Sequence, residues 1–107
     1  MRRYYGSMLE EILELNRRAA AAGDFEAAYH LLMAALHTAD HAADEAVLTR
    51  IGEIARQQGT AVEAVRPPHH LSRRQAQARG QTAVYDSFIA HLEAVRLRLQ
   101  SQRQLKR

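Results

Sequence analysis

Apolar residues recur every three or four positions through most of the chain, which is the period of a helix with one buried face. The first such segment extends from Ser7 to about Ala22. Ser7 and Glu10 have the spacing of a capping box, so we expect this helix to begin at Ser7 after a frayed lead at residues 1–6. Its expected buried positions are Met8, Leu9, Ile12, Leu15 and Ala19.

A glycine followed by an aspartate predicts a tight turn after this helix. Gly23 can adopt the left-handed conformation that ends many helices, and the carboxylate of Asp24 can cap the next helix. Two helices joined this closely lie antiparallel and bury their facing sides. The second helix is expected to end within residues 38–42. Its predicted buried positions are Phe25, Ala28, Tyr29, Leu32, Ala35, Leu36 and Ala39.

The same turn is predicted to recur after a third helix. The buried positions expected in that helix are Val47, Leu48, Ile51, Ile54 and Ala55. Gly59 is expected to repeat the role of Gly23, and Thr60 with Glu63 forms a second capping box that would start a fourth helix. Pro67 and Pro68 should stop that helix early, because proline lacks the backbone N–H that a helix interior requires.

The last third of the chain contains an irregular stretch followed by a long helix. Within residues 67–81, Ser72 is placed to cap a short helix that ends at Gly80. Thr82 is expected to cap the last helix, which should continue to about Gln100 or beyond, and residues 101–107 are expected to fray. The apolar residues of this helix have the alternating three and four spacing of a coiled-coil seam, which can pack on the earlier helices or on a second subunit. They are Tyr85, Phe88, Leu92, Val95 and Leu99.

Composition adds a division of charge to this helical pattern. The 107 residues fit one domain, and the chain has no cysteine, which excludes disulfides and thiolate metal sites. Residues 1–65 hold ten acidic and six basic residues, a net charge of −4, whereas residues 66–107 hold nine basic and two acidic residues, a net charge of +7. No apolar run approaches the length of a membrane span, so we expect a cytoplasmic protein without a membrane partner.

Residues 9–66 resemble a tetratricopeptide repeat followed by a shortened copy 36 residues later. The first unit matches at Ile12, Leu15, Gly23, Asp24, Phe25, Ala28, Ala35 and Leu36, and the copy at Leu48, Ile51, Gly52, Ala55, Gly59 and Ala64. Asn16 replaces a small residue, no proline closes the first unit near Asp40, and Pro67 cuts the second unit short. The resemblance implies a scaffold that binds proteins or peptides, while an unrelated small helical bundle is the alternative.

Histidines and aspartates near the end of the second helix suggest a metal site. His37, Asp40, His41 and Asp44 would share one face if the whole segment were helical. Two imidazoles one turn apart can bind a divalent metal, with the carboxylate of Asp44 completing the set. The alternative is a solvated helix end, where histidines help to satisfy the last backbone carbonyls.

The connector after the two prolines is the second candidate site. His69, His70, Arg73 and Arg74 can present a loop that binds a partner or an anion. In the alternative interpretation, this basic segment crosses the acidic helices and neutralises them. Adjacent histidines point apart on a regular backbone, so His69 and His70 are not expected to serve one ligand.

Other function classes have weaker support in the sequence. The basic last third permits nucleic-acid binding, but its arginines are spread over some forty residues and no nucleic-acid-binding motif accompanies them. No phosphate-binding glycine loop or nucleophile motif indicates an enzyme, and we expect no cofactor. We therefore predict a single all-α domain: helical hairpins at residues 1–66, a basic connector at 67–81, and a C-terminal helix and tail at 82–107. Its expected role is to bind another protein or a second copy of itself.

Overall fold

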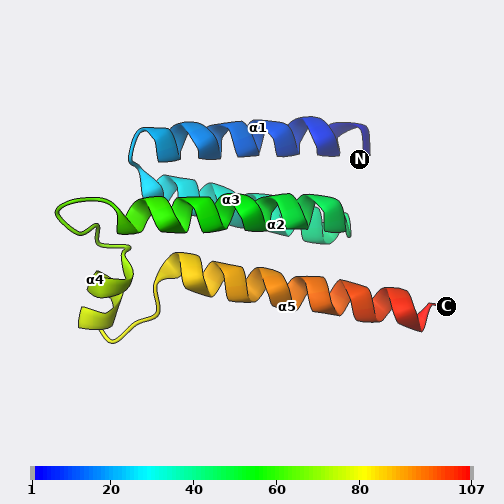
Figure 1. The fold of residues 1–107 in the computed structure, drawn as a ribbon. Helices are drawn as coiled ribbons and strands as arrows, with labels where there is room; N and C mark the ends of the chain where they lie inside the picture. Colours follow the sequence, from blue (N-terminus) through cyan, green and yellow to red (C-terminus); the bar gives the residue numbers. More distant parts are fainter. Residues whose placement is uncertain (1, 107) are drawn as a thin grey trace.

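Four long helices run up and down beside one another, and a short helix lies at one end of them (Figure 1). The computed structural model describes residues 2–106, with side chains from residue 5 onward. The helices are α1 (Arg2–Ala21), α2 (Phe25–His41), α3 (Glu45–Glu63), the short α4 (Arg73–Ala78) and α5 (Val84–Leu105). No strand occurs within the described range, and the predicted all-α fold with a long C-terminal helix is confirmed.

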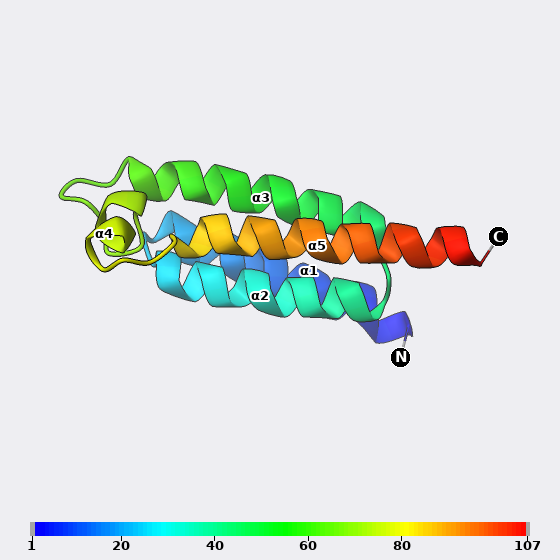
Figure 2. The same cartoon turned by 90° about the horizontal axis from the view of Figure 1, so that it is seen from below.

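The long helices form a flattened bundle measuring 50 × 28 × 17 Å. Two views at right angles place α2 and α3 side by side in the middle, with α1 on one side and α5 on the other (Figures 1 and 2). Consecutive long helices are antiparallel, so α1 and α3 run in the same direction. Among residues 2–106, no helix combines the length and the apolar composition needed to cross a bilayer.

The core lies where α2, α3 and α5 meet. The stripe predicted for α2 is buried except for Tyr29, which is half-buried, and all five predicted seam positions of α5 are buried. α5 packs on α2 and α3 of its own chain. Gly52 permits the close approach of α3 and α5, because a Cβ atom at this position would lie 2.8 Å from Cδ2 of Leu92.

Two turns of the same design connect the first three helices. Gly23 has a φ of 80°, and the carboxylate of Asp24 accepts a hydrogen bond from the backbone N–H of Ala27, as predicted. The second turn repeats this geometry with Ala43, whose φ is 52°, and with Asp44, which caps α3 through the N–H of Val47. The N–H groups of both aspartates donate back to the preceding helix, at 2.9 and 3.0 Å.

The predicted turn at Gly59 is wrong. α3 continues through Gly59 and Thr60 to Glu63, because its apolar positions keep their helical spacing as far as Val62. Thr60 does not cap a new helix, and its hydroxyl donates instead to the backbone carbonyl of Arg56 at 3.1 Å. The second tight turn therefore follows the first by 20 residues, at Ala43, where the sequence has no glycine.

Three predicted helix ends also differ from the structure. Ser7 lies inside α1, which already includes Arg2, while Met1 lies outside the described residues. The N-cap of α5 is Ala83, which makes no side-chain cap, so Thr82 does not have its predicted role. α5 extends to Leu105, so most of the tail predicted to be frayed is helical, and Arg107 lies outside the described residues. The predicted cap at Ser72 is confirmed, because its hydroxyl accepts from the N–H of Gln75 at 3.2 Å.

The buried face of α1 is rotated from the predicted one, and of the five predicted positions only Leu9 is fully buried. We call the face that packs on the bundle the inner stripe, which consists of the buried Leu9, Leu13 and Asn16 and the half-buried Ala20. We call the other four predicted positions the outer stripe, which consists of Met8, Ile12, Leu15 and Ala19. Each outer residue precedes an inner residue by one position, so the two stripes are rotated by about 100° around the helix. Met8 and Leu15 of the outer stripe are each 48% exposed.

Candidate interaction surfaces

A buried polar network fixes the inner stripe in place. Asn16, 1% exposed, donates from Nδ2 to the backbone carbonyl of Ala28 at 2.7 Å and to Oε1 of Gln58 at 3.1 Å. Gln58 returns a hydrogen bond from Nε2 to Oδ1 of Asn16 at 2.7 Å. The hydroxyl of Tyr85 lies 3.1 Å from Oε1 of Gln58 and 3.3 Å from the carbonyl oxygen of Phe25. The network thus joins α1, α2, α3 and α5.

This network explains the orientation of α1. A buried amide is costly unless its donors and acceptor are satisfied, and only the inner position of Asn16 brings it to Gln58. Burial also raises the pKa of Tyr85, which keeps its hydroxyl protonated as a donor. In the sequence, Asn16 stands out only as a departure from the repeat, and this role was not predicted. The available signal was the regular spacing of Leu9, Leu13, Asn16 and Ala20.

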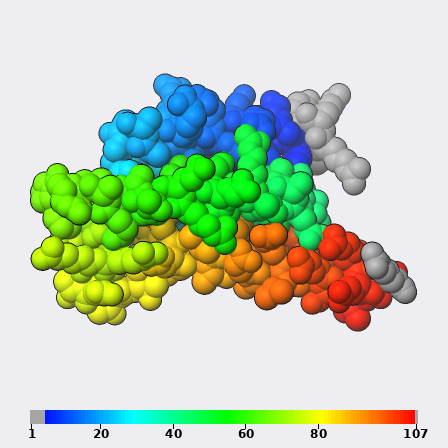
Figure 3. Space-filling view, in the orientation of Figure 1, coloured from blue at the N-terminus to red at the C-terminus, as the bar shows by residue number. Residues whose placement is uncertain are grey.

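A groove of about 330 Å³ separates α1 from α3. The two helices lie side by side on the face shown in Figure 3, where α1 is blue and α3 is green. Leu13, Ala20 and Ile54 give the groove an apolar lining, and the paired amides of Asn16 and Gln58 also line it. The remaining lining residues are Glu10, Glu14, Arg17, Arg50 and Gln57.

Ion pairs border this groove. The guanidinium of Arg50 on α3 binds Glu10 on α1, with N–O distances of 2.7 and 3.2 Å. This bidentate hydrogen bond lowers the pKa of Glu10. Arg17 pairs with Glu14 one turn earlier on the same helix, at 2.6 Å. The border of the α1–α3 groove therefore has charges of both signs around a partly apolar interior.

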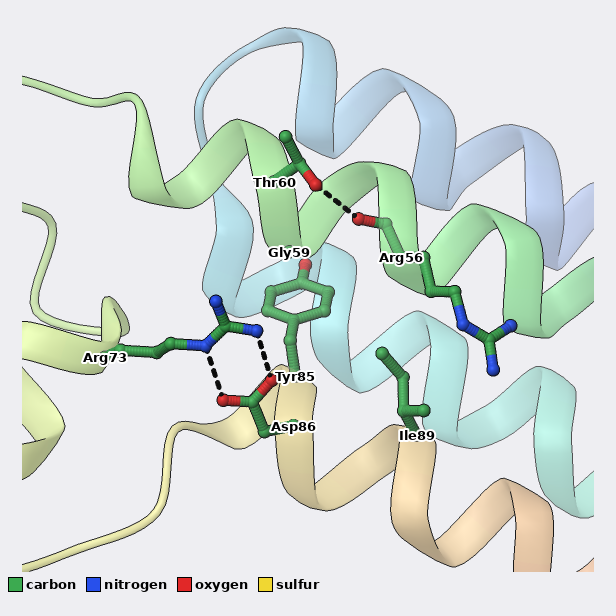
Figure 4. Close-up of a pocket in the computed structure, with 7 residues that line it drawn as sticks. All are labelled: Arg56, Gly59, Thr60, Arg73, Tyr85, Asp86 and Ile89. Carbon is green, nitrogen blue, oxygen red and sulfur yellow. Dashed lines mark hydrogen bonds and ion pairs between the residues drawn. The ribbon is translucent and has the colours of Figure 1, made fainter.

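A smaller pocket of about 150 Å³ lies where α4 approaches α3 and α5 (Figure 4). Arg73 points from α4 toward Asp86 on α5 and forms two hydrogen bonds of 2.8 Å with its carboxylate. These bonds raise the pKa of Arg73 and lower that of Asp86. The other arginine of the pocket, Arg56, pairs with Glu93 at 3.1 Å. Both cations already have carboxylate partners, so the pocket offers little positive charge to an added anion.

Of the residues predicted for the connector site, His69 and His70 lie together, in a geometry that the sequence did not predict. The rings of His69 and His70 stack with centroids 4.5 Å apart, so the prediction that they point apart is wrong. The reason is that they lie outside any helix or strand, where no regular backbone separates neighbouring side chains. Nδ1 of His69 accepts from the N–H of Leu71 at 3.0 Å, and its ring packs edge-on against Phe25 at 5.5 Å.

An acidic side chain of α2 lies beside the two histidines. Nε2 of His70 lies 3.3 Å from the carboxylate of Glu26 on α2. Burial, with the neighbouring His70, lowers the pKa of His69. Arg73 is held by Asp86, and Arg74 is exposed on α4. The four residues named from the sequence therefore do not converge on one anion, and an anion site stays a prediction of the sequence alone.

The residues predicted to bind metal do not share one helical face. α2 ends at His41, so Asp44 lies beyond it in the turn, where its carboxylate caps α3 and accepts from the hydroxyl of Tyr5 at 3.0 Å. Asp40 pairs with Arg98 of α5, while His37 is exposed. Within residues 2–106, no three histidine or acidic side chains are grouped as metal ligands would be.

The two oppositely charged parts of the chain meet within the molecule. Arg98 pairs with Asp40, and Arg103 lies 2.6 Å from Glu45. These contacts join basic α5 to α2 and α3, which belong to the acidic first part. Such exposed pairs each stabilise a fold by less than about 1 kcal/mol, but they occupy arginines that a nucleic acid would otherwise contact.

Comparison with known proteins adds no family to this description. No protein-family model matches the chain, and no curated protein or solved structure matches it either. Function must therefore be argued from the surfaces themselves.

Proposed function

We propose that this protein is a non-enzymatic, cytoplasmic protein-binding module that holds a helix of a partner in the α1–α3 groove. The observation that supports this function is the groove itself, about 330 Å³ in volume, with an apolar lining and charges of both signs at its border. Helices that bind in grooves insert apolar side chains at three- and four-residue spacing, and charged borders select their orientation.

The arrangement of the first three helices supports a helix as the occupant. α1 and α3 run in the same direction, and α2 packs antiparallel against both of them. α2 packs against α1 and α3, and the α1–α3 groove is a separate surface formed by the same two helices. An amphipathic partner helix would pack there as α2 packs against its neighbours, with its apolar side on Leu13 and Ile54. The resemblance to tetratricopeptide repeats stays a prediction, and it implies the same class of function.

Site-specific photo-crosslinking in cells that naturally make this protein tests the proposal. A benzophenone amino acid replaces Gln57, an exposed residue that lines the groove, and a matched variant has it at Gln102, an exposed residue of α5. We expect Gln57 to capture a distinct partner through a segment with helical apolar spacing. Ile54→Lys should abolish this capture, because it places a charge in the apolar lining.

Two results would contradict the proposal. One is the same set of captured proteins at Gln57 and Gln102, which would indicate random collision. The other is a capture at Gln57 that survives Ile54→Lys unchanged while circular dichroism shows the helices intact.

A further inference from the structure

The outer stripe of α1 is an apolar surface that the rest of the described chain leaves partly uncovered. Met8 and Leu15 are each 48% exposed, and Ile12 and Ala19 are half-buried. Their spacing of four, three and four residues aligns them along one face of the helix. Single exposed leucines are ordinary on protein surfaces, whereas an aligned apolar stripe is typical of a surface that packs against another helix.

Two exposed, oppositely charged residues flank this stripe on its solvent side. Glu11 follows Met8 by three residues and precedes Leu15 by four, while Arg18 follows Leu15 by three. Residues at these separations are surface neighbours on a helix. Neither Glu11 nor Arg18 forms an ion pair with any side chain of residues 5–106. They lie on one flank, at similar distances before and after Leu15.

This arrangement of charge is complementary to itself. A two-fold axis close to Leu15 would place a second α1 antiparallel to the first and would keep the flank with Glu11 on the same side of both helices. Glu11 of each copy then lies opposite Arg18 of the other. A parallel pairing about a two-fold axis along the helices would instead place the Glu11 flanks of the two copies on opposite sides, so neither Glu11–Arg18 pair could form.

We propose that the outer stripe binds a second copy of this chain, through antiparallel packing of the two α1 helices about a two-fold axis near Leu15. The apolar residues of the stripe form the centre of the interface, and two Glu11–Arg18 pairs border it. The α1–α3 groove involves different residues of α1, so the dimer leaves the proposed partner site open.

Analytical ultracentrifugation of the full chain from micromolar to millimolar concentration is the first test. We expect a monomer–dimer equilibrium that Leu15→Lys weakens by at least about a hundredfold, because it places two cations beside the axis. Leu97→Lys is the matched control, since Leu97 is also an exposed leucine, on α5. It should leave the dimerisation constant unchanged. A wild-type monomer at every concentration would overturn the proposal, as would an equal effect of the two variants.

Exchange of the two charges tests the antiparallel register with substitutions that leave the apolar stripe intact. Glu11→Arg alone and Arg18→Glu alone each create two like-charge contacts and should weaken the dimer about tenfold. The double variant Glu11→Arg/Arg18→Glu restores both pairs and should recover wild-type affinity. If the double variant is as weak as the single variants, the proposed register is wrong. If none of the three differs from wild type, another surface forms the dimer.

Discussion

The two stripes of α1 have the same spacing but different surroundings. The inner stripe contacts α2 and α3 and includes a polar residue, Asn16, whereas the outer stripe is entirely apolar and remains half exposed. The less apolar face is the buried one, because Asn16 finds its hydrogen-bond partners only there. A buried amide whose hydrogen bonds are satisfied can therefore decide which face of a helix is buried, even when another face is more apolar. It also leaves a second apolar face available for another chain.

Truncating one leucine of each stripe should give the largest difference in the free energy of unfolding between the two stripes. Leu9→Ala should lower the free energy of unfolding by about 2–5 kcal/mol, because it opens a cavity at a residue that is 2% exposed. Leu15→Ala should change it by no more than about 0.5 kcal/mol in the monomer. Urea unfolding at a concentration too low for dimers measures both values. Equal losses would show that the two faces do not differ as described.

Replacing the side-chain amides of Asn16 and Gln58 tests whether their pairing orients α1. Asn16→Leu should cost about 1–3 kcal/mol, because it leaves the buried amide of Gln58 without its partner. The double variant Asn16→Leu/Gln58→Leu should cost less than the single variant, since both unpaired groups are removed and Tyr85 keeps the carbonyl of Phe25. Urea unfolding of the wild type, of Asn16→Leu, of Gln58→Leu and of the double variant provides this comparison. A double variant that loses the sum of both single costs would argue against a coupled pair.

Tyr5 extends the inner stripe by one turn and gives a smaller, pH-dependent effect. Burial and the hydrogen bond to Asp44 raise the pKa of Tyr5 from 10.0 to about 12. The folded state therefore holds this proton more tightly, so its contribution is complete below pH 10 and is lost as the pH rises toward 12. Tyr5→Phe should cost about 1 kcal/mol at about pH 8 and less at about pH 11. Unfolding curves at both pH values measure the difference, and a cost that grows with pH would contradict this assignment.

The parts of the fold that could be predicted from sequence are those where local chemistry and packing agree. Gly23 and Asp24 marked the first turn, and the apolar spacing of α2 and α5 identified their buried faces. The end of α2 at His41 lies within the predicted residues 38–42. The tight turn that follows was not predicted, because Ala43 adopts the left-handed conformation without being glycine. Gly59 suggested a turn but lies within α3, so a glycine marks a helix end only where the apolar pattern also stops.

The candidate surfaces were less predictable, because they depend on contacts between distant segments. The pairing of Asn16 with Gln58 spans 42 residues and determines which face of α1 is buried. The α1–α3 groove follows from that orientation. The stacking of His69 on His70 arises in an irregular segment where no periodic pattern applies. The apolar spacing in the sequence selected the outer stripe together with Leu9 as the buried face of α1, whereas tertiary contacts bury the stripe that contains Asn16.

Disulfide trapping tests most directly whether the outer stripe pairs two chains as proposed. The chain has no cysteine, so Leu15→Cys and Met8→Cys each introduce a single thiol at positions of equal exposure. Near the two-fold axis, the two thiols of a Leu15→Cys dimer approach disulfide range, whereas those of a Met8→Cys dimer lie about 20 Å apart along the helices. We predict rapid oxidation of Leu15→Cys to a covalent dimer, whereas Met8→Cys should form no covalent dimer. Equal crosslinking at both positions, or at neither, would contradict the antiparallel dimer.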